Sequence, residues 1–253
     1  MIRRSWQEWT SNIRQLKNQE RVYSWSRIIQ NLAFPPTCLL CGDQGKEDRD
    51  LCRRCWETLP FLHNACPSCG LPLTQPGLPH CGACLKKPPP FDRMITAFRY
   101  EEPIRHLIQS LKYGSRHPNA RLLSALLADR IEQTEKLPEA IIPVPLHPRR
   151  YQERRFNQAL EIARLISMRL DLPLEYSICH RVRHTDAQAR LHAKERFRNI
   201  RKSFTISRPF AHKHVALLDD VVTTGATVSE LATELRRAGA EQIDVWACAR
   251  ALP

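Results

Sequence analysis

The sequence has no long apolar run. None of its 253 residues lies in a stretch that approaches the roughly 18 uninterrupted apolar residues of a membrane-spanning helix. The segment Met1-Ile-Arg-Arg-Ser-Trp also lacks the apolar core and the small-residue cleavage site of a secretory signal. We therefore expect a cytoplasmic protein without a transmembrane segment, in which thiols stay reduced.

Acidic residues are scarce. The chain has 26 Asp and Glu against 39 Lys and Arg, which gives a net charge of +13. This balance favours a polyanionic partner, either nucleic acid or a phosphorylated small molecule. A generally basic surface without a dedicated partner is the alternative.

Composition divides the chain into three regions. Residues 1–34 are basic, with tryptophans and aliphatic residues near the helical period, and they predict a helical segment that packs on its neighbour or contacts nucleic acid or a membrane surface. Residues 35–87 are rich in cysteine. After Pro88-Pro89-Pro90, residues 91–253 alternate short β-rich runs with helical ones, which predicts a parallel sheet covered by helices on both faces. The expected strands are 93–100, 140–144, 215–218 and 242–249, and the expected helices are 103–113, 119–134, 157–170 and 225–238.

Eight of the ten cysteines form four C-x-x-C pairs. The pairs are Cys38/Cys41, Cys52/Cys55, Cys66/Cys69 and Cys81/Cys84. Thiolates favour tetrahedral zinc, and eight sulfurs supply two closed structural sites with no open position for catalysis. Redox-active pairs are a poor alternative because four pairs occur in fewer than fifty residues.

The spacing leaves the pairing of these cysteines open. Sequential pairing, with the first two pairs on one zinc and the last two on another, is preferred to a cross-braced arrangement. His63 and His80 lie close to the pairs and are alternative ligands. Cys179 and Cys248 stand alone in strand-like surroundings and are expected to be small buried residues.

The run Val215–Val228 predicts a phosphate-binding site. A buried strand ends at two carboxylates, and a loop of threonine and glycine then opens a helix. Backbone N–H groups and hydroxyls at a helix start suit a phosphate monoester, and the carboxylates suit ribose hydroxyls or Mg²⁺. Threonine capping alone would not require the acidic pair. The residues assigned to this site are Asp219, Asp220, Val221, Thr223, Thr224, Gly225, Ala226 and Thr227.

This run resembles the PRPP (5-phosphoribosyl-1-pyrophosphate) motif of type I phosphoribosyltransferases, which is a hydrophobic strand, an acidic pair and then T-T-G-x-T. The resemblance implies that Asp219 and Asp220 contact the ribose hydroxyls beside the reacting carbon. It also implies that the loop binds the 5′-phosphate and that Mg²⁺ accompanies PRPP.

A wider resemblance, over about residues 22–250, is to the ComF/GntX family of bacterial competence-related proteins. It is carried by Leu111–Gly114, by Pro143–His147 leading to Arg154–Gln158, and by Arg183–Leu191 leading to Arg196 and Asn199. Arg155 departs from the family, which usually has glycine there. The resemblance implies a double zinc-ribbon module before a type I phosphoribosyltransferase-like α/β domain, and a function in DNA uptake or processing. Single-stranded DNA, or another nucleic acid, and DNA-uptake proteins are the implied partners.

Basic residues elsewhere are candidates for the pyrophosphate of PRPP, because transfer needs cationic groups on that leaving group. Lys112 lies at the end of the helix at 103–113, and the others, His147, Arg149 and Arg154, follow the strand at 140–144. A solvated basic loop is the alternative for the last three, and an interaction with the helix dipole is the alternative for Lys112. Residues 181–202, also strongly basic, are interpreted as a lid, a nucleic-acid contact or both.

Three functions are therefore open. The first is a PRPP-binding protein of DNA uptake or processing, and the second is an active nucleobase phosphoribosyltransferase of salvage metabolism. The third is a non-catalytic nucleic-acid-binding scaffold, which would have no need of both acids. The sequence shows no base-recognition signature that would name an acceptor.

Overall fold

The computed structural model describes residues 37–45, 50–73, 75, 77–114, 117–183, 198–206 and 211–252. The helical segment predicted for residues 1–34 lies outside them. The chain forms two compact units, Met1–Glu57 and Thr58–Pro253, and each is described by itself. Within the described residues, no helix is long and apolar enough to cross a membrane.

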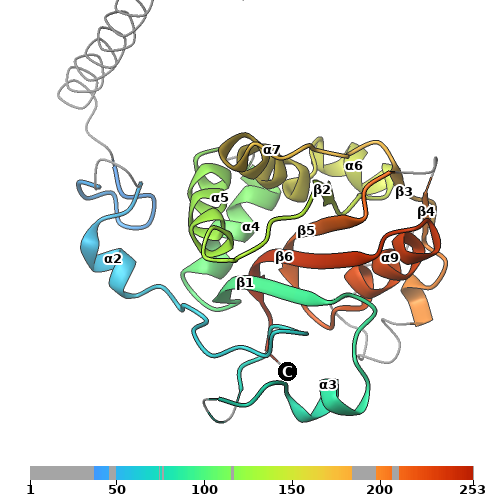
Figure 1. The fold of residues 1–253 in the computed structure, drawn as a ribbon. Helices are drawn as coiled ribbons and strands as arrows, with labels where there is room; N and C mark the ends of the chain where they lie inside the picture. The colour runs from blue at the N-terminus through green and yellow to red at the C-terminus, as the bar shows by residue number, and fades with distance from the viewer. Residues whose placement is uncertain are drawn as a thin grey trace, which may run out of the picture. The chain divides into compact units, whose positions relative to one another are not determined.

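The second unit is built on a four-stranded sheet in which all the strands run parallel (Figure 1). The strand order is β1 (Arg93–Arg99), β6 (Gln242–Arg250), β5 (His214–Val222) and β2 (Ala140–Pro143). All four residues of β2 are buried, as are eight of the nine in β6. Burial on both faces explains why these strands are continuous apolar runs. The predicted parallel sheet is confirmed.

Helices cover both faces of this sheet. Ala216 and Val215 point to opposite faces because side chains alternate along a strand. On one face, α9 (Ala226–Arg237) packs its buried residues against a cluster that includes Val215. On the other face lie α4 (Ile104–Gly114), α5 (His117–Ile131) and α7 (Gln158–Leu170), as Figure 1 shows.

Beyond the cysteine-rich region, three short elements were not among the helices and strands listed from the sequence, although Cys179 was placed in strand-like surroundings. Helix α6 (Pro148–Arg154) follows β2, where only a basic loop was expected. Strands β3 (Cys179–Arg181) and β4 (Phe204–Ile206) form a separate antiparallel pair. At three residues each, these strands are too short to show a periodic pattern.

The end of β5 differs from the prediction. We expected the strand to stop at Leu218, but it continues to Val222 because β6 runs beside it for the same length. Val222 is opposite Arg250, the last residue of β6. Asp219 and Asp220 therefore lie within the final part of a paired strand and not after it.

The second cysteine cluster, formed by Cys66, Cys69, Cys81 and Cys84, lies in the same unit as the sheet. The segment that contains these cysteines includes α3 (Gly82–Lys86) and runs along the free edge of β1. The N–H of Met94 donates to the carbonyl of Pro67 at 2.7 Å, and the N–H of Arg99 donates to that of Pro60 at 2.9 Å. Leu62 donates in turn to Ala97 at 3.0 Å. The first unit contains the other cluster and the short helix α2 (Arg53–Glu57).

Candidate functional site

The first four-cysteine cluster consists of Cys38, Cys41, Cys52 and Cys55. All four sulfurs lie within 4.8 Å of one another, and those of Cys41 and Cys52 are 3.7 Å apart. A tetrahedral zinc with Zn–S bonds of about 2.3 Å places its sulfurs about 3.8 Å apart. Gly42, in the left-handed region with φ 80°, turns its N–H onto the carbonyl of Cys38.

The second cluster has the same construction. Its sulfurs belong to Cys66, Cys69, Cys81 and Cys84, and those of Cys69 and Cys81 are 3.6 Å apart. Each cluster takes two consecutive C-x-x-C pairs, so the predicted sequential pairing is confirmed and the cross-braced one is excluded.

Neither candidate histidine joins a cluster. The Nδ1 of His80 lies 2.9 Å from the hydroxyl of Ser68, and the ring of His63 lies 5.8 Å from that of Phe61. The two ligand sets are therefore all cysteine.

Within each cluster, the neighbouring groups shift the pKa values of the thiols. Burial raises the pKa of Cys38, but N–H groups, first that of Cys52, outweigh it and bring the pKa to about 6. In the second cluster, burial raises the pKa of Cys69 to about 11, and Cys81 and Cys66 add to this rise, while the N–H of Leu71 and the thiol of Cys84 oppose it. One ionised sulfur thus opposes ionisation of the next, and a divalent metal removes this conflict. Two four-sulfur sets of this geometry fit two structural zinc ions.

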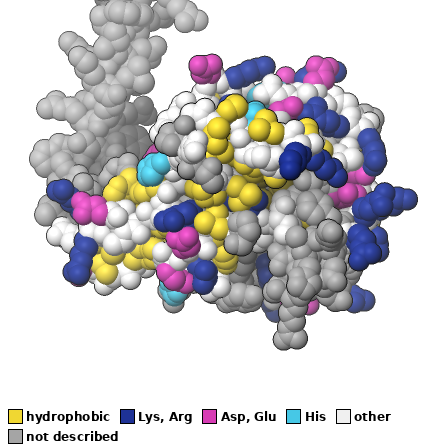
Figure 2. Space-filling view, turned by 90° about the horizontal axis from the view of Figure 1, so that it is seen from below, with side chains coloured by type: hydrophobic (Ala, Val, Ile, Leu, Met, Phe, Trp, Pro, Cys, Tyr) yellow, Lys and Arg dark blue, Asp and Glu magenta, His cyan; other side chains and the backbone are white. Residues whose placement is uncertain are grey.

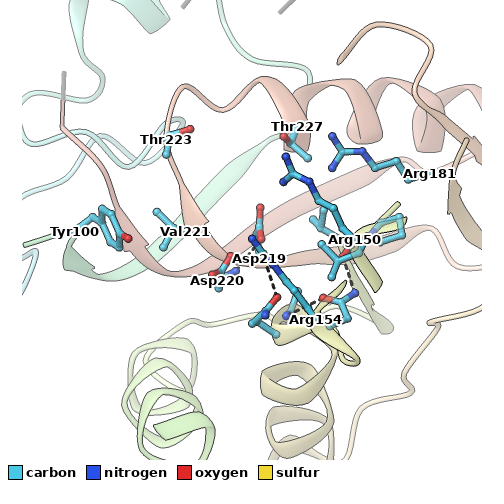
Figure 3. A pocket seen from close by; sticks show the side chains of 15 residues that line it. Tyr100, Arg150, Arg154, Arg181, Asp219, Asp220, Val221, Thr223 and Thr227 are labelled. Atoms are coloured by element: carbon cyan, nitrogen blue, oxygen red, sulfur yellow. Dashed lines mark hydrogen bonds between the residues drawn. The ribbon is translucent and has the colours of Figure 1, made fainter. Parts of the chain in front are cut away.

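A separate pocket of about 290 Å³ lies where β5 and β2 end (Figure 3). Its volume is near the lower end of the range for small-molecule sites, roughly 300–1,000 Å³. The pocket is lined by the end of β1, the loop after β2, α6, the start of α7, β3 and the run that follows Leu218. The lining residues are Tyr100, Val144, Pro145, Leu146, Arg150, Arg154, Asn157, Gln158, Ala159, Arg181, Asp219, Asp220, Val221, Thr223 and Thr227.

Two carboxylates form the acidic part of the pocket. Asp220 is buried and Asp219 is half-buried. The Oδ1 of Asp219 accepts the N–H of Asp220 at 2.9 Å, which fixes the first carboxylate against the backbone. The structure therefore brings both predicted acids into one pocket, at the carboxyl end of a parallel sheet.

The loop after β5 opens helix α9 beside these acids. Gly225 is the residue before the helix, and its φ of 80° is one that glycine adopts without strain. The side chains of Thr223 and Thr227 line the pocket, whereas the Thr224 hydroxyl accepts the N–H of Ala226 at 3.4 Å. The first N–H groups of a helix have no intrahelical partners, so this loop offers an anion both hydroxyls and N–H donors.

Three guanidinium groups line the pocket together with the acids (Figure 3). Arg150 and Arg154 come from α6, and the Nη1 of Arg154 donates to the side chain of Gln158 at 3.4 Å. Arg181 comes from β3 and is buried. Burial, followed by Arg150, lowers the pKa of Arg181 to about 10, while Asp219 opposes that shift. The guanidinium therefore keeps its charge at neutral pH.

Helix α6 determines which of the basic residues after β2 reach the pocket. Arg150 and Arg154 are four residues apart and lie on one face, whereas Arg149 is exposed and does not line the pocket. His147 caps the helix, and its Nδ1 accepts the N–H of Arg149 at 3.3 Å. Lys112 is in α4, and its side chain lies outside the described part of the chain.

The sequence analysis did not name Tyr100, and it placed Arg181 in the basic run 181–202, interpreted as a lid or a nucleic-acid contact, and not in the pocket itself. Both line the pocket, although they are distant from the acids along the chain. Arg181 opens the basic run 181–202, so its charge was visible, but its direction depends on the pairing of β3 with β4. Tyr100 follows β1 directly, and no local pattern marked it.

Known proteins resemble this chain both in its cysteine-rich part and over most of its length. The model of the double zinc ribbon domain matches residues 29–85. Competence protein F of Haemophilus influenzae is 40% identical over 224 residues, which cover 85% of this chain and 96% of that protein. The chain belongs to the competence protein F family. DNA utilization protein YhgH of Escherichia coli K12 is 37% identical over 232 residues, or 87% of this chain and 100% of that protein.

More distant similarities are found among solved structures. The glutamine PRPP amidotransferase of B. subtilis is 18% identical with a TM-score of 0.36, over 54% of this chain and 30% of that one. TT1426 of Thermus thermophilus is 16% identical with a TM-score of 0.31, over 53% of this chain and 83% of that one. The type I phosphoribosyltransferase-like fold of this family member rests on its own parallel sheet and on the β5–loop–α9 arrangement.

Proposed function

We propose that this member of the competence protein F family binds PRPP together with Mg²⁺ in the pocket at the end of β5, in the service of DNA uptake or processing. The observation that carries the proposal is the composition of this one pocket. It combines two carboxylates, a helix-opening loop with two lining threonines, and three arginines. Ribose hydroxyls, a phosphate monoester and a diphosphate are the groups that these three sets complement.

Each set has a role in this proposal. The carboxylates of Asp219 and Asp220 accept hydrogen bonds from ribose hydroxyls or hold Mg²⁺, which prefers carboxylate and phosphate oxygens. The N–H groups of the loop, with Thr223 and Thr227, hold the 5′-phosphate. The arginines of α6 and β3 hold the pyrophosphate, because a guanidinium matches phosphate oxygens in a planar fork.

The relatives are the second support for this function. Their names, competence protein F and DNA utilization protein, refer to the handling of DNA. Single-stranded DNA and proteins of DNA uptake are the partners that we propose, in the cytoplasm, where the zinc-binding thiols stay reduced.

The thermal unfolding of the zinc-loaded protein tests PRPP binding. PRPP with Mg²⁺ at 100 times its dissociation constant should stabilise the folded chain by about 2.7 kcal/mol. Ribose 5-phosphate, which lacks the pyrophosphate, is the control and should stabilise the chain less at the same concentration. If the melting temperature stays the same at PRPP concentrations as high as millimolar, the proposal is wrong.

Transfer of the ribosyl group to a base is a second candidate, favoured by the aromatic ring of Tyr100 at the pocket. In that reaction the bond from C1′ to the pyrophosphate oxygen breaks, the base nitrogen bonds to C1′ and loses its proton to solvent, and pyrophosphate leaves. The carboxylates would stabilise the positive charge that develops on the ribose ring. Incubation with PRPP, Mg²⁺ and a panel of bases tests this candidate, since only transfer releases pyrophosphate in proportion to the base.

A further inference from the structure

Arg250 is a buried arginine that does not line the pocket. It ends β6 and is only 5% exposed. Its Nε donates to the carbonyl of Cys69, a residue of the second cysteine cluster, at 2.8 Å. Its Nη1 donates to the carbonyl of Val222 at 3.1 Å, to that of Ala251 at 2.8 Å and also to that of Thr223. One planar guanidinium therefore contacts both the turn of the second cysteine cluster and the start of the loop between β5 and α9, which we call the phosphate loop.

These contacts orient the peptides of the loop. In a trans peptide the carbonyl and the N–H point in opposite directions. Because the carbonyls of Val222 and Thr223 face Arg250, the N–H groups of Thr223 and Thr224 face away from it. These are the first donors of the loop that we assign to the 5′-phosphate. Arg250, together with the N–H of Ala251, which donates to the carbonyl of Val222 at 2.9 Å, thus fixes the direction in which the loop presents them.

The other side of Arg250 is fixed by the metal-binding turn. The peptide between Cys69 and Gly70 donates its N–H to the carbonyl of Cys66 at 2.8 Å, while its own carbonyl accepts from Arg250. Gly70 has a φ of 68°, and a Cβ there would come within 2.9 Å of the sulfur of Met94 on β1. The turn is therefore held between the cluster, the sheet edge and the guanidinium.

We propose that Arg250 is a positioning residue that couples the second zinc centre to the phosphate loop, so that metal in this centre strengthens PRPP binding. The inference rests on the proposed function, because PRPP is the ligand whose affinity reports the coupling. Zinc at Cys66, Cys69, Cys81 and Cys84 would hold the turn, the turn would hold Arg250, and Arg250 would hold the loop. By linkage, PRPP must strengthen metal binding by the same factor.

The two zinc centres supply matched variants. The double variant C66S/C69S should lose one zinc per chain and bind PRPP about 5- to 150-fold more weakly, the range typical of coupled sites. The variant C38S/C41S loses the same number of thiols and one zinc from the other unit, and it should bind PRPP like the wild type. Calorimetric titration with PRPP and Mg²⁺, and zinc analysis of each protein, give both quantities.

Arg250→Lys separates positioning from folding. Lysine keeps the charge but lacks the planar fork, so the zinc-loaded variant should bind PRPP at least about fivefold more weakly while its circular dichroism stays unchanged. Arg236→Lys is the matched control. That arginine also joins distant segments, through Pro90, Asp92 and Glu241, but it does not contact the phosphate loop.

A spectroscopic measurement reports the coupling from the metal side. Cobalt in the C38S/C41S protein occupies only the second centre, and PRPP should change its thiolate absorption, while the same protein with Arg250→Lys should show a smaller change. If the wild type binds PRPP but C66S/C69S and Arg250→Lys bind it equally well, the coupling is wrong and the proposed function stands. If the wild type binds no PRPP, the proposed function fails, and the coupling fails with it.

Discussion

At the candidate site, carboxylates and guanidinium groups line the same small pocket. Charges of both signs in one pocket complement a ligand that itself has two kinds of group, hydroxyls with a bound cation at one end and phosphates at the other. Arg181 is the most informative of these residues because it is buried and keeps its charge at neutral pH. Its guanidinium lies at the wall of the pocket near Asp219, and a guanidinium matches phosphate oxygens in a planar fork.

We expect Arg181→Gln to weaken PRPP binding about 10- to 150-fold, since a hydrogen bond to a charged group contributes about 1.5–3 kcal/mol. The affinity for ribose 5-phosphate should change little, because that molecule has no pyrophosphate for Arg181 to hold. Calorimetric titrations with both ligands measure the difference. Arg149→Gln, on the exposed side of α6, is the control. An equal loss for both ligands would contradict the pyrophosphate role.

Arg155 gives a stability prediction at the same scale. It has a φ of 63°, in the left-handed region, where the resembled family usually has glycine. This conformation costs a non-glycine residue roughly 1–2 kcal/mol, whereas glycine costs roughly 0.5–1 kcal/mol in chain entropy. Arg155→Gly should therefore raise the free energy of unfolding by about 0.5–1 kcal/mol in urea denaturation. A lower value would show that the arginine side chain stabilises α6 in some other way.

Much of the site could be predicted from residues close together in the sequence. The acids, Thr223 and Thr227 occur within one short run, and the structure places all of them at the pocket. The cationic side was predicted less well, because a loop was expected where α6 forms. Without the helix, nothing distinguished Arg149, which is exposed and does not line the pocket, from Arg150, which does.

At the scale of elements, the segment of the second cysteine cluster, from Pro60 to Cys84 (the second ribbon), stabilises the edge of the sheet. Three backbone hydrogen bonds join it to β1, and the rings of Phe61 and Phe98 are 5.0 Å apart. An edge strand presents unpaired backbone groups, and the ribbon covers those of β1. The first ribbon belongs to the other unit.

Loss of the second zinc should therefore destabilise the sheet, whereas loss of the first should not. With about 1 kcal/mol for each of the three hydrogen bonds, and about 2–4 °C per kcal/mol for a domain of this size, C66S/C69S should melt roughly 6–12 °C lower. C38S/C41S should melt within about 2 °C of the wild type. Calorimetric melting curves measure both. Equal shifts in the two variants would contradict the assignment of the ribbons to different units.

The long elements were predictable because local sequence determines them. The four strands of the sheet are buried apolar runs, and the helices that cover them show helical spacing. Helix α6 has seven residues and no apolar face, so no periodicity revealed it. The end of β5 depends on its partner, because pairing with β6 extends the strand through Asp219 and Asp220. The local sequence of β5 does not predict this pairing.

For the whole molecule, the excess of positive charge is the property that bears on DNA. In the face that Figure 2 shows, Lys and Arg side chains occur in several groups and not as one continuous patch. The sequence also has a basic run at 190–202 with six cations, which are Arg190, Lys194, Arg196, Arg198, Arg201 and Lys202. Spread charge of this kind favours binding to the phosphate backbone without regard to sequence.

Replacing these six residues with glutamine should weaken the binding of single-stranded DNA and flatten its salt dependence. Each phosphate contact contributes about 0.7 to the slope of log K against log salt for single strands, so three lost contacts reduce the slope by about 2. Fluorescence anisotropy of a labelled oligonucleotide over a salt series measures it. An unchanged slope would show that another part of the chain binds DNA.

The central claim is that the pocket at the end of β5 binds PRPP through its acids and its loop. The most direct test is a calorimetric titration of PRPP and Mg²⁺ into the wild type and into the double variants D219N/D220N and T223V/T227V. The control D129N/E132Q removes two acids that pair with Arg169 and do not line the pocket. We predict that the wild type and the control bind PRPP alike and that each pocket variant binds it roughly 100-fold more weakly or worse. Equal affinity in all four proteins, or no binding by the wild type, would contradict the claim.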